Sequence, residues 1–107
     1  MRYRIHRHPD VKQDLFDIVD LIADYAGIGV AERKLEEIEQ SIRKLSQTPH
    51  IGSLRDDLYP GLRAIPTARK GVIAFTVDDD AQQVYIISLT DAGADWISRL
   101  PQRVERS

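Results

Sequence analysis

Three cations lie near one another in the chain, at Arg63, Arg69 and Lys70. Arg63 falls in a predicted strand, and the other two fall in the turn that follows it. Guanidinium and ammonium groups gathered in this way bind phosphate or carboxylate. Arg4, in the first predicted strand, enlarges the set if it faces the same side of the sheet. The residues leave two interpretations equally open, an anion-binding site and solvated charges at a strand edge.

The histidines form a weaker candidate site. His6 and His8 are two residues apart on a predicted strand, which places two potential metal ligands on one face. His50 is remote in sequence, and no acid stands at a suitable third spacing, so we expect ordinary surface histidines. The acidic run from Asp78 to Asp80 lacks the glycine and the distal glutamate of a calcium loop. We therefore expect no metal site and no cofactor.

Paired carboxylates are a third candidate for chemistry. Asp14, Asp17 and Asp24 lie beside the apolar stripe of the first predicted helix. There we expect an acidic, solvated flank rather than catalytic carboxylates. The sequence has no Gly-x-Ser-x-Gly nucleophile elbow and no phosphate-binding glycine-rich loop. Hydrolase and nucleotide-binding functions therefore have no support among these motifs.

Two helices with matching apolar stripes must position these residues. In residues 9–26, which open with Pro9 and Asp10, apolar side chains recur three and four residues apart, at Val11, Leu15, Ile18, Ile22 and Tyr25. The same spacing returns in residues 30–47, at Ala31, Leu35, Ile38, Ile42 and Leu45. Because Gly27 stops the first helix and the link is very short, we expect an antiparallel helical hairpin.

Strands are predicted on both sides of this hairpin. Residues 3–7 alternate before it, and three apolar runs follow it, near 62–65, at 71–77 and at 84–90. Alternation places Ile73, Phe75 and Val77 opposite Val72, Ala74 and Thr76, and Tyr85, Ile87 and Leu89 opposite Val84, Ile86 and Ser88. The short loop 78–83 makes the last two strands antiparallel. The predicted fold class is α+β: an N-terminal strand, an α-helical hairpin, and then a three-stranded antiparallel meander that completes one sheet.

The bulk composition limits the domain organisation and the function. The 107 residues, 42% hydrophobic and 30% charged, suit one domain over residues 1–107, with a short C-terminal tail from about residue 97. The net charge of −2 argues against broad, nonspecific nucleic-acid binding. With no cysteine, no signal peptide and no apolar run long enough to cross a bilayer, we expect a cytoplasmic protein that contacts no membrane.

One face of the predicted sheet lacks cover. Two helices can shield only one side of a small sheet, and the strands are apolar on both sides. The second face must therefore be open, or be covered by the C-terminal tail or by a partner. This requirement indicates a binding function.

The order of these elements resembles the RelE/ParE superfamily of bacterial toxins. The similarity covers nearly the whole chain: the helix begun at Pro9, the hairpin, Pro49 with Gly52, Gly61-Leu62-Arg63, the strands at 72–77 and 84–89, and Asp95. It implies the toxin of a bacterial type II toxin–antitoxin operon, held inactive in a hetero-oligomer by a cognate antitoxin whose C-terminal part wraps the helices and sheet. The antitoxin contacts expected on that basis are Leu15, Ile22, Leu54, Leu58, Val72 and Ala74.

Two branches of this superfamily differ in their target. RelE-like members cut messenger RNA in the ribosome, and ParE-like members poison DNA gyrase. Arg63 matches an arginine that the ribonucleases use. However, Ser88 and Asp91 stand where many relatives carry an arginine and a histidine, and no tyrosine follows Tyr85. The long helical hairpin also looks more like ParE.

We therefore expect a protein that inhibits DNA gyrase by binding. The candidates for contact with the target or with phosphate are Arg63, Arg69, Lys70 and Arg4. The alternative is a ribosome-dependent messenger RNA endoribonuclease. The departures at Ser88 and Asp91 also fit a divergent or weakened toxin, and the sequence assigns no catalytic residue.

Overall fold

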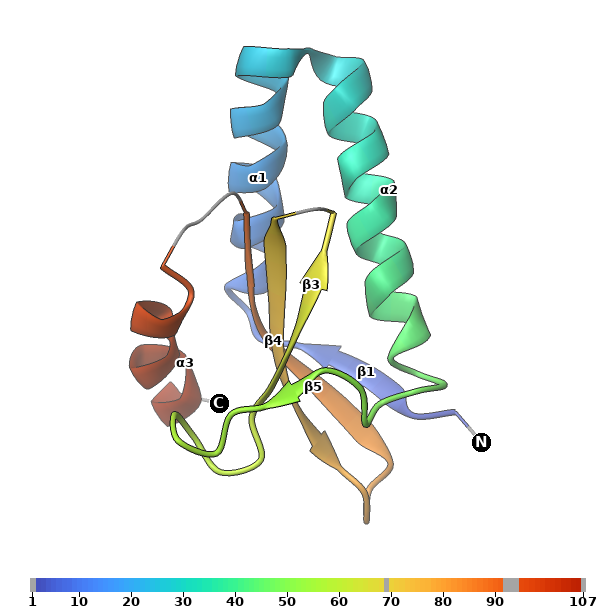
Figure 1. The fold of residues 1–107 in the computed structure, drawn as a ribbon, viewed down its shortest axis with the longest axis vertical. Helices are drawn as coiled ribbons and strands as arrows, with labels where there is room; N and C mark the ends of the chain where they lie inside the picture. Colours follow the sequence, from blue (N-terminus) through green and yellow to red (C-terminus); the bar gives the residue numbers. More distant parts are fainter. Residues whose placement is uncertain (1, 69, 92–94, 107) are drawn as a thin grey trace.

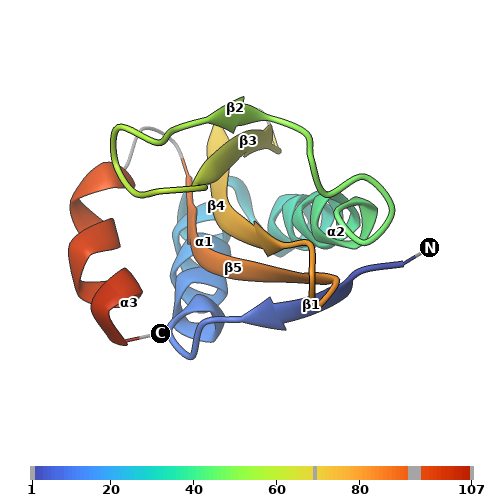
Figure 2. The same cartoon turned by 90° about the horizontal axis from the view of Figure 1, so that it is seen from below.

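The computed structural model describes residues 2–68, 70–91 and 95–106. A mixed sheet of five strands carries a helical hairpin on one face and a short C-terminal helix on the other (Figure 1). Figure 2 shows this short helix and the second hairpin helix on opposite sides of the sheet. The predicted α+β class, with its N-terminal strand and helical hairpin, is confirmed.

The hairpin consists of α1 (Val11–Ala26) and α2 (Ile28–Lys44), joined by Gly27 alone. Gly27 has a φ of 92°, which only glycine adopts readily. Its amide donates to the Ala23 carbonyl of α1, and its own carbonyl accepts from the Ala31 amide of α2. One residue therefore ends the first helix and starts the second, so α2 begins two residues earlier than predicted.

The sheet has the order β1-β5-β4-β3-β2. Its strands are β1 (Arg4–Arg7), β2 (Ser53–Leu54), β3 (Arg63–Thr67), β4 (Gly71–Asp78) and β5 (Gln83–Thr90). β1 pairs with β5 in parallel, whereas the other neighbours are antiparallel. The sheet is thus mixed rather than wholly antiparallel, because the chain leaves β1 through the helical hairpin and returns beside it only at β5.

A bulge changes the faces of β5. Ala74 pairs with Ser88, but the next residue, Phe75, pairs with Ile86, so Ile87 is an extra residue in β5. Leu89 therefore packs beneath the helices with Ile86, and the predicted grouping of Leu89 with Ile87 is wrong. Simple alternation also predicts that Ser88 lies on the same face as Ile86. Ser88 instead pairs with Ala74, which packs on the face of the sheet away from the hairpin.

The core has two layers. Between the hairpin and the sheet lie Val11, Ile18, Ile22, Ala31, Ile38, Ile42, Leu45, Ile65, Ile73, Phe75, Val84, Ile86 and Leu89. On the opposite face, Leu62, Ala74, Ile87 and Leu100 form a smaller cluster, with Trp96 and Val104 packed against it. The C-terminal segment, which contains the 3₁₀ turn Ile97–Arg99 and helix α3 (Leu100–Arg106), thus covers the second face. Among the described helices, none is long and apolar enough to span a bilayer.

One prediction from the apolar stripes is wrong. Tyr25 was grouped with the buried face of the first helix, but its side chain is 68% exposed. The stripe predicts which side of α1 faces inward, and it carries no information on where the sheet beneath that side ends. α1 extends beyond the sheet, so its last turn packs against no strand (Figure 1).

Candidate interaction surfaces

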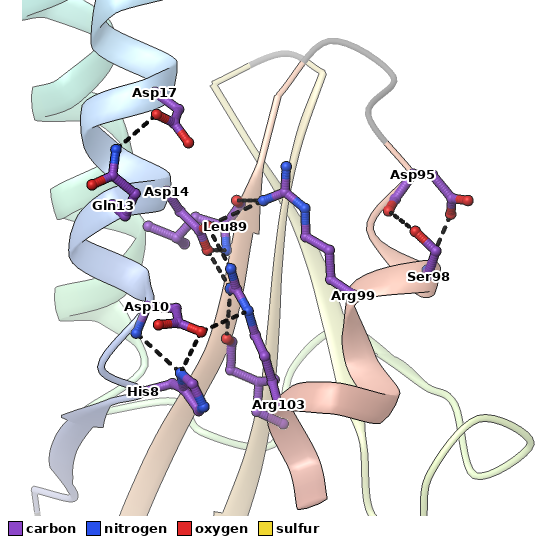
Figure 3. Close-up of polar contacts among 11 residues, drawn as sticks. His8, Asp10, Gln13, Asp14, Asp17, Leu89, Asp95, Ser98, Arg99 and Arg103 are labelled. Carbon is purple, nitrogen blue, oxygen red and sulfur yellow. Dashed lines mark hydrogen bonds and ion pairs between the residues drawn. The ribbon is translucent and has the colours of Figure 1, made fainter. Parts of the chain in front are cut away.

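The upper half of β5 forms an edge that no strand of the described residues covers. β1 pairs with β5 only as far as Ile86. Beyond that point, side chains bind the β5 backbone: the Leu89 amide donates to Asp14 Oδ2 at 3.0 Å, and Arg103 Nη1 donates to the Ile87 carbonyl at 3.1 Å (Figure 3). Arg99 Nη1 donates to the Leu89 carbonyl at 3.4 Å. These contacts satisfy backbone groups that a neighbouring strand would otherwise pair.

Asp14 is the centre of this network. Its side chain is 3% exposed and accepts from Arg103 Nη2 at 2.8 Å and from Arg99 Nη1 at 3.1 Å. The hydrogen bond that Arg103 donates to Asp14 raises the pKa of Arg103, and the negative charges of Asp14 and Asp10 add to this. The prediction of a solvated flank is therefore wrong for Asp14, because two arginines from a distant segment neutralise it.

His8 is also buried, contrary to the predicted surface position. It is 3% exposed, and its Nδ1 accepts a hydrogen bond from the Asp10 amide at 3.0 Å (Figure 3). The imidazole therefore holds the first turn before α1. This contact occupies one of its ring nitrogens, and no group of three potential metal ligands occurs among the described residues.

A second polar cluster joins three distant segments at the lower end of the sheet. Asp79, in the turn after β4, accepts from the Tyr3 hydroxyl at 2.8 Å and contacts His50 Nε2 at 2.6 Å through the same Oδ1. The rings of Tyr3 and His50 meet edge to face, with centroids 6.0 Å apart. The Tyr3 hydrogen bond lowers the pKa of Asp79, and His50 and the charge of Arg63 lower it further.

Sequence reasoning missed this cluster. In the sequence, Asp79 falls in the short loop between two predicted strands, and His50 is remote from the other two histidines. Tyr3, His50 and Asp79 meet only because β1 and β5 are neighbours and the loop after α2 returns to the same end of the sheet. No local spacing of these residues signals the contact.

The predicted basic set is dispersed. Arg63 opens β3, and Lys70 lies in the turn beyond the far end of that strand. Five strand residues separate the two ends by roughly 16 Å. Arg4 alternates with Tyr3 and Ile5, which pack toward the helices, so it lies on the other face of the sheet. Arg63 pairs with Phe75, which packs beneath the helices, so the two arginines lie on opposite faces. Arg69 lies outside the described residues.

An apolar groove runs along the outer side of the hairpin. It has a volume of about 340 Å³ and is lined by Lys12, Leu15, Phe16, Val19, Leu35 and Glu39. Phe16 is 55% exposed there. At the margin, Glu39 is held by two hydrogen bonds from Arg7, at 2.8 and 3.2 Å. The groove is therefore an accessible apolar surface with fixed charges at its rim.

The residues predicted to contact an antitoxin fall into two groups. Leu15 lines the groove, Leu54 is exposed on the edge strand β2, and Leu58 and Val72 are half-buried. Ile22 and Ala74 are 2% and 0% exposed, respectively, because they belong to the two core layers. A partner therefore reaches these last two only if the core opens.

Ser88 and Asp91 follow one another closely at the end of β5. Ser88 is 0% exposed and pairs with Ala74 beneath the C-terminal segment. Asp91 is half-buried at the rim of a small pocket beside Arg99. The described structure thus leaves the Ser88 hydroxyl inaccessible to a large substrate.

Comparison with known proteins agrees with this architecture. The family model of the ParE toxin of type II toxin–antitoxin system parDE matches residues 5–96. The chain belongs to the ParE toxin family. The resemblance to the RelE/ParE superfamily, closer to ParE, is thereby confirmed.

Individual relatives are more distant. This ParE-family chain is 37% identical to Toxin ParE3 of Caulobacter vibrioides over 60 residues, which make up 56% of the chain. The match spans about 60% of the length of that relative. Such a partial match supports the family and leaves the activity to be inferred.

Three solved structures share the fold of this ParE-family chain. The chromosomal ParDE toxin–antitoxin system from P. aeruginosa aligns with a TM-score of 0.71 at 20% identity, covering 85% of this chain and 97% of that one. A mutant of the E. coli toxin RelE in the free state aligns with a TM-score of 0.67 at 16% identity, and the alignment covers 99% of this chain and 98% of RelE. The toxin–antitoxin complex RelBE2 from Mycobacterium tuberculosis aligns with a TM-score of 0.61 at 14% identity, and the alignment covers 86% of this chain and 100% of that one. At these identities the similarity shows the fold alone.

Proposed function

We propose that this chain acts in the bacterial cytoplasm as a toxin that inhibits DNA gyrase by binding and is neutralised by a cognate antitoxin. The proposal rests mainly on the match between residues 5–96 of this chain and the family model of the ParE toxin. The toxin–antitoxin systems among its structural neighbours support an antitoxin partner. The acidic hairpin and the buried Ser88 fit an inhibitor that works through its surface.

The antitoxin binds the groove on the hairpin in this proposal. An amphipathic helix buries its apolar face in such a groove through side chains three and four residues apart. Leu15, Phe16 and Val19 present a matching apolar surface, and Lys12 and Glu39 offer charges for the polar rim. Because exposed aromatic side chains supply much of the binding energy in interfaces, Phe16 is the expected anchor.

A change at Phe16 tests the groove. We expect Phe16→Glu to weaken the complex with the cognate antitoxin by about 30-fold or more, since a carboxylate replaces the aromatic ring that the complex would bury. The Phe16→Leu variant keeps the apolar contact and should bind within a few-fold of the unchanged toxin. Titration calorimetry with both variants measures this. If Phe16→Glu binds as tightly as Phe16→Leu, the antitoxin lies elsewhere.

The polar cluster at the lower end of the sheet favours a second function, cleavage of RNA. An ionised Asp79 can only accept a hydrogen bond, so His50 Nε2 is the donor of this contact and Nδ1 is the ring nitrogen left to take a proton. That base would take the proton of a ribose 2′-hydroxyl, while Arg63 stabilises the charge that develops on the phosphate. The exposure of His50 and Asp79 makes the cluster accessible to RNA.

His50 and Arg63 separate the two functions. If the chain is a ribonuclease, His50→Gln should lower transcript cleavage at least about 100-fold, because a general base contributes that much. Arg63→Ala should then nearly abolish cleavage. For a gyrase inhibitor, His50→Gln should leave inhibition unchanged, and Arg63→Ala should weaken it only in part. Cleavage assays in a translating extract and gyrase assays on the same preparations distinguish these outcomes.

A further inference from the structure

The tip of the helical hairpin stands clear of the rest of the molecule. Ile22 is the last core residue of α1, at 2% exposure, and Ala31 is the first core residue of α2, at 0%. Residues 24–29 between them are all exposed. Figure 1 shows the hairpin extending past the upper ends of β3 and β4. Nothing in the described chain therefore packs over this end of the hairpin.

Large apolar side chains gather at this tip. Leu21, Tyr25 and Ile28 are 52%, 68% and 65% exposed, respectively. Leu21 and Tyr25 lie one turn apart on α1, and Ile28 opens α2 directly after the connecting glycine. Large exposed apolar side chains gathered within eight residues in this way indicate an interaction surface rather than a contribution to stability.

The same tip is strongly acidic. Asp17, Asp20 and Asp24 recur three and four residues apart, so they form one exposed stripe beside Leu21 and Tyr25. The chain contains no lysine or arginine between residues 13 and 29. The tip thus combines an apolar patch with a negative flank whose own segment contains no lysine or arginine.

This surface is separate from the antitoxin groove. Phe16 in the groove and Tyr25 at the tip are nine residues apart, which is about 2.5 turns of an α-helix. The two side chains therefore point to opposite sides of α1. One helix can serve two partners: Tyr25 is remote from the groove, whereas Asp20, one turn from Phe16, lies on the side of the acidic stripe nearer to the groove.

We propose that the hairpin tip is a surface that contacts the target, and that it docks on a basic, DNA-binding surface of that enzyme. The inference rests on the proposed inhibition of gyrase. An enzyme that acts on DNA needs basic surfaces to neutralise phosphates, and these surfaces are complementary to the three aspartates. Leu21, Tyr25 and Ile28 then supply the apolar centre of the contact, with the aspartates at its rim.

Two tip variants of the full-length toxin test this. One is Tyr25→Ala, and the other changes Asp17, Asp20 and Asp24 together to asparagine. We expect each to raise the toxin concentration for half-inhibition of supercoiling by about tenfold or more, since central aromatic and complementary charged groups dominate such contacts. The asparagine variant should also flatten the salt dependence of inhibition, because fewer charges remain to be screened.

Two control variants carry the same kinds of substitution at positions outside the tip. Tyr59→Ala removes an exposed aromatic ring in the loop before β3. Replacing Glu36, Glu37 and Asp80 by their amides removes the same number of exposed charges as the tip variant. We expect both controls to inhibit gyrase like the unchanged toxin. All variants should bind the antitoxin within a few-fold of the unchanged toxin, which also shows that they fold.

The outcomes distinguish the inference from the function on which it rests. Tip variants that inhibit gyrase as well as the unchanged toxin overturn the inference and leave gyrase as the target. A charge control that loses as much inhibition as the tip variant also overturns it, because net charge rather than the tip then matters. If the unchanged toxin does not inhibit gyrase, both the proposed function and this inference fail.

Discussion

At the scale of single residues, Asp14 has the largest structural role. It links α1 to the open edge of β5 and to two arginines of the C-terminal segment. We expect Asp14→Asn to lower the free energy of unfolding by about 3 kcal/mol, because Arg103 loses the charge that compensates its burial. Urea denaturation measures the change. Asp17→Asn, at an exposed position one turn along α1, should alter stability by less than about 0.5 kcal/mol.

Equal effects of Asp14→Asn and Asp17→Asn would contradict the role of the network. The result would mean that the negative charge of Asp14 adds nothing to stability beyond the hydrogen bonds that an amide oxygen can also accept. In that case the amide would still accept from the Leu89 backbone and from Arg103.

Ser88 is a second residue whose environment predicts a measurable effect. Its hydroxyl is buried and has no hydrogen-bond partner among the described residues. We expect Ser88→Ala to raise the free energy of unfolding by about 1 kcal/mol, since an unsatisfied polar group is removed. Ser41→Ala is the control, because Thr67 donates to Ser41 at 2.7 Å. The free energy of unfolding of Ser41→Ala should fall by about 1 kcal/mol, because this hydrogen bond is lost.

Asp79 gives a pH-dependent prediction. Hydrogen bonds from Tyr3 and His50 hold its pKa below the ordinary value of 3.8. A depressed folded-state pKa stabilises the fold above that ordinary value, and the contribution disappears as the pH falls through the folded-state pKa. Titration of the Asp79 carboxyl by NMR should show the pKa rising toward 3.8 in Tyr3→Phe. An unchanged pKa in that variant would show that the Tyr3 bond is absent in solution.

At the scale of elements, Gly27 sets the geometry of the hairpin. A side chain at this position meets no atom within 4 Å, so the cost of adding one comes only from the backbone angle of 92°. We expect Gly27→Ala to cost about 1–3 kcal/mol of stability. Gly29→Ala, inside α2, removes a poor helix former and should stabilise the protein by up to about 1 kcal/mol. Denaturation curves in which Gly27→Ala matches the unchanged protein would refute this account of the turn.

The elements also show what the sequence can and cannot predict. The apolar stripes correctly predict both hairpin helices, and the apolar runs predict β1, β3, β4 and β5, whereas the two-residue strand β2 was not predicted. The bulge at Ile87 cannot be predicted from the sequence, because the residues around it are all compatible with a regular strand. Only the pairing of Phe75 with Ile86 instead of Ile87 reveals the extra residue. The burial of Asp14 escapes prediction for a different reason: its partner Arg103 lies 89 residues away, so only the folded chain reveals the pair.

At the scale of the whole molecule, the surfaces are distributed over separate regions. The apolar groove proposed to bind the antitoxin lies on the outer side of the hairpin, and the acidic tip lies at the far end of the hairpin. The Tyr3–His50–Asp79 cluster lies at the opposite end of the sheet. The predicted basic set does not form one site, since β3 separates Arg63 from Lys70. This distribution suits a protein that binds partners at several places.

Inhibition of gyrase by the purified toxin is the most direct test of the proposed function. The toxin should block supercoiling by gyrase in a concentration-dependent manner, and equimolar antitoxin should restore it. The same preparation should leave transcripts intact in a translating extract. Transcripts cut at codon boundaries, together with unaffected gyrase activity, would contradict the proposal and identify the chain as a ribonuclease.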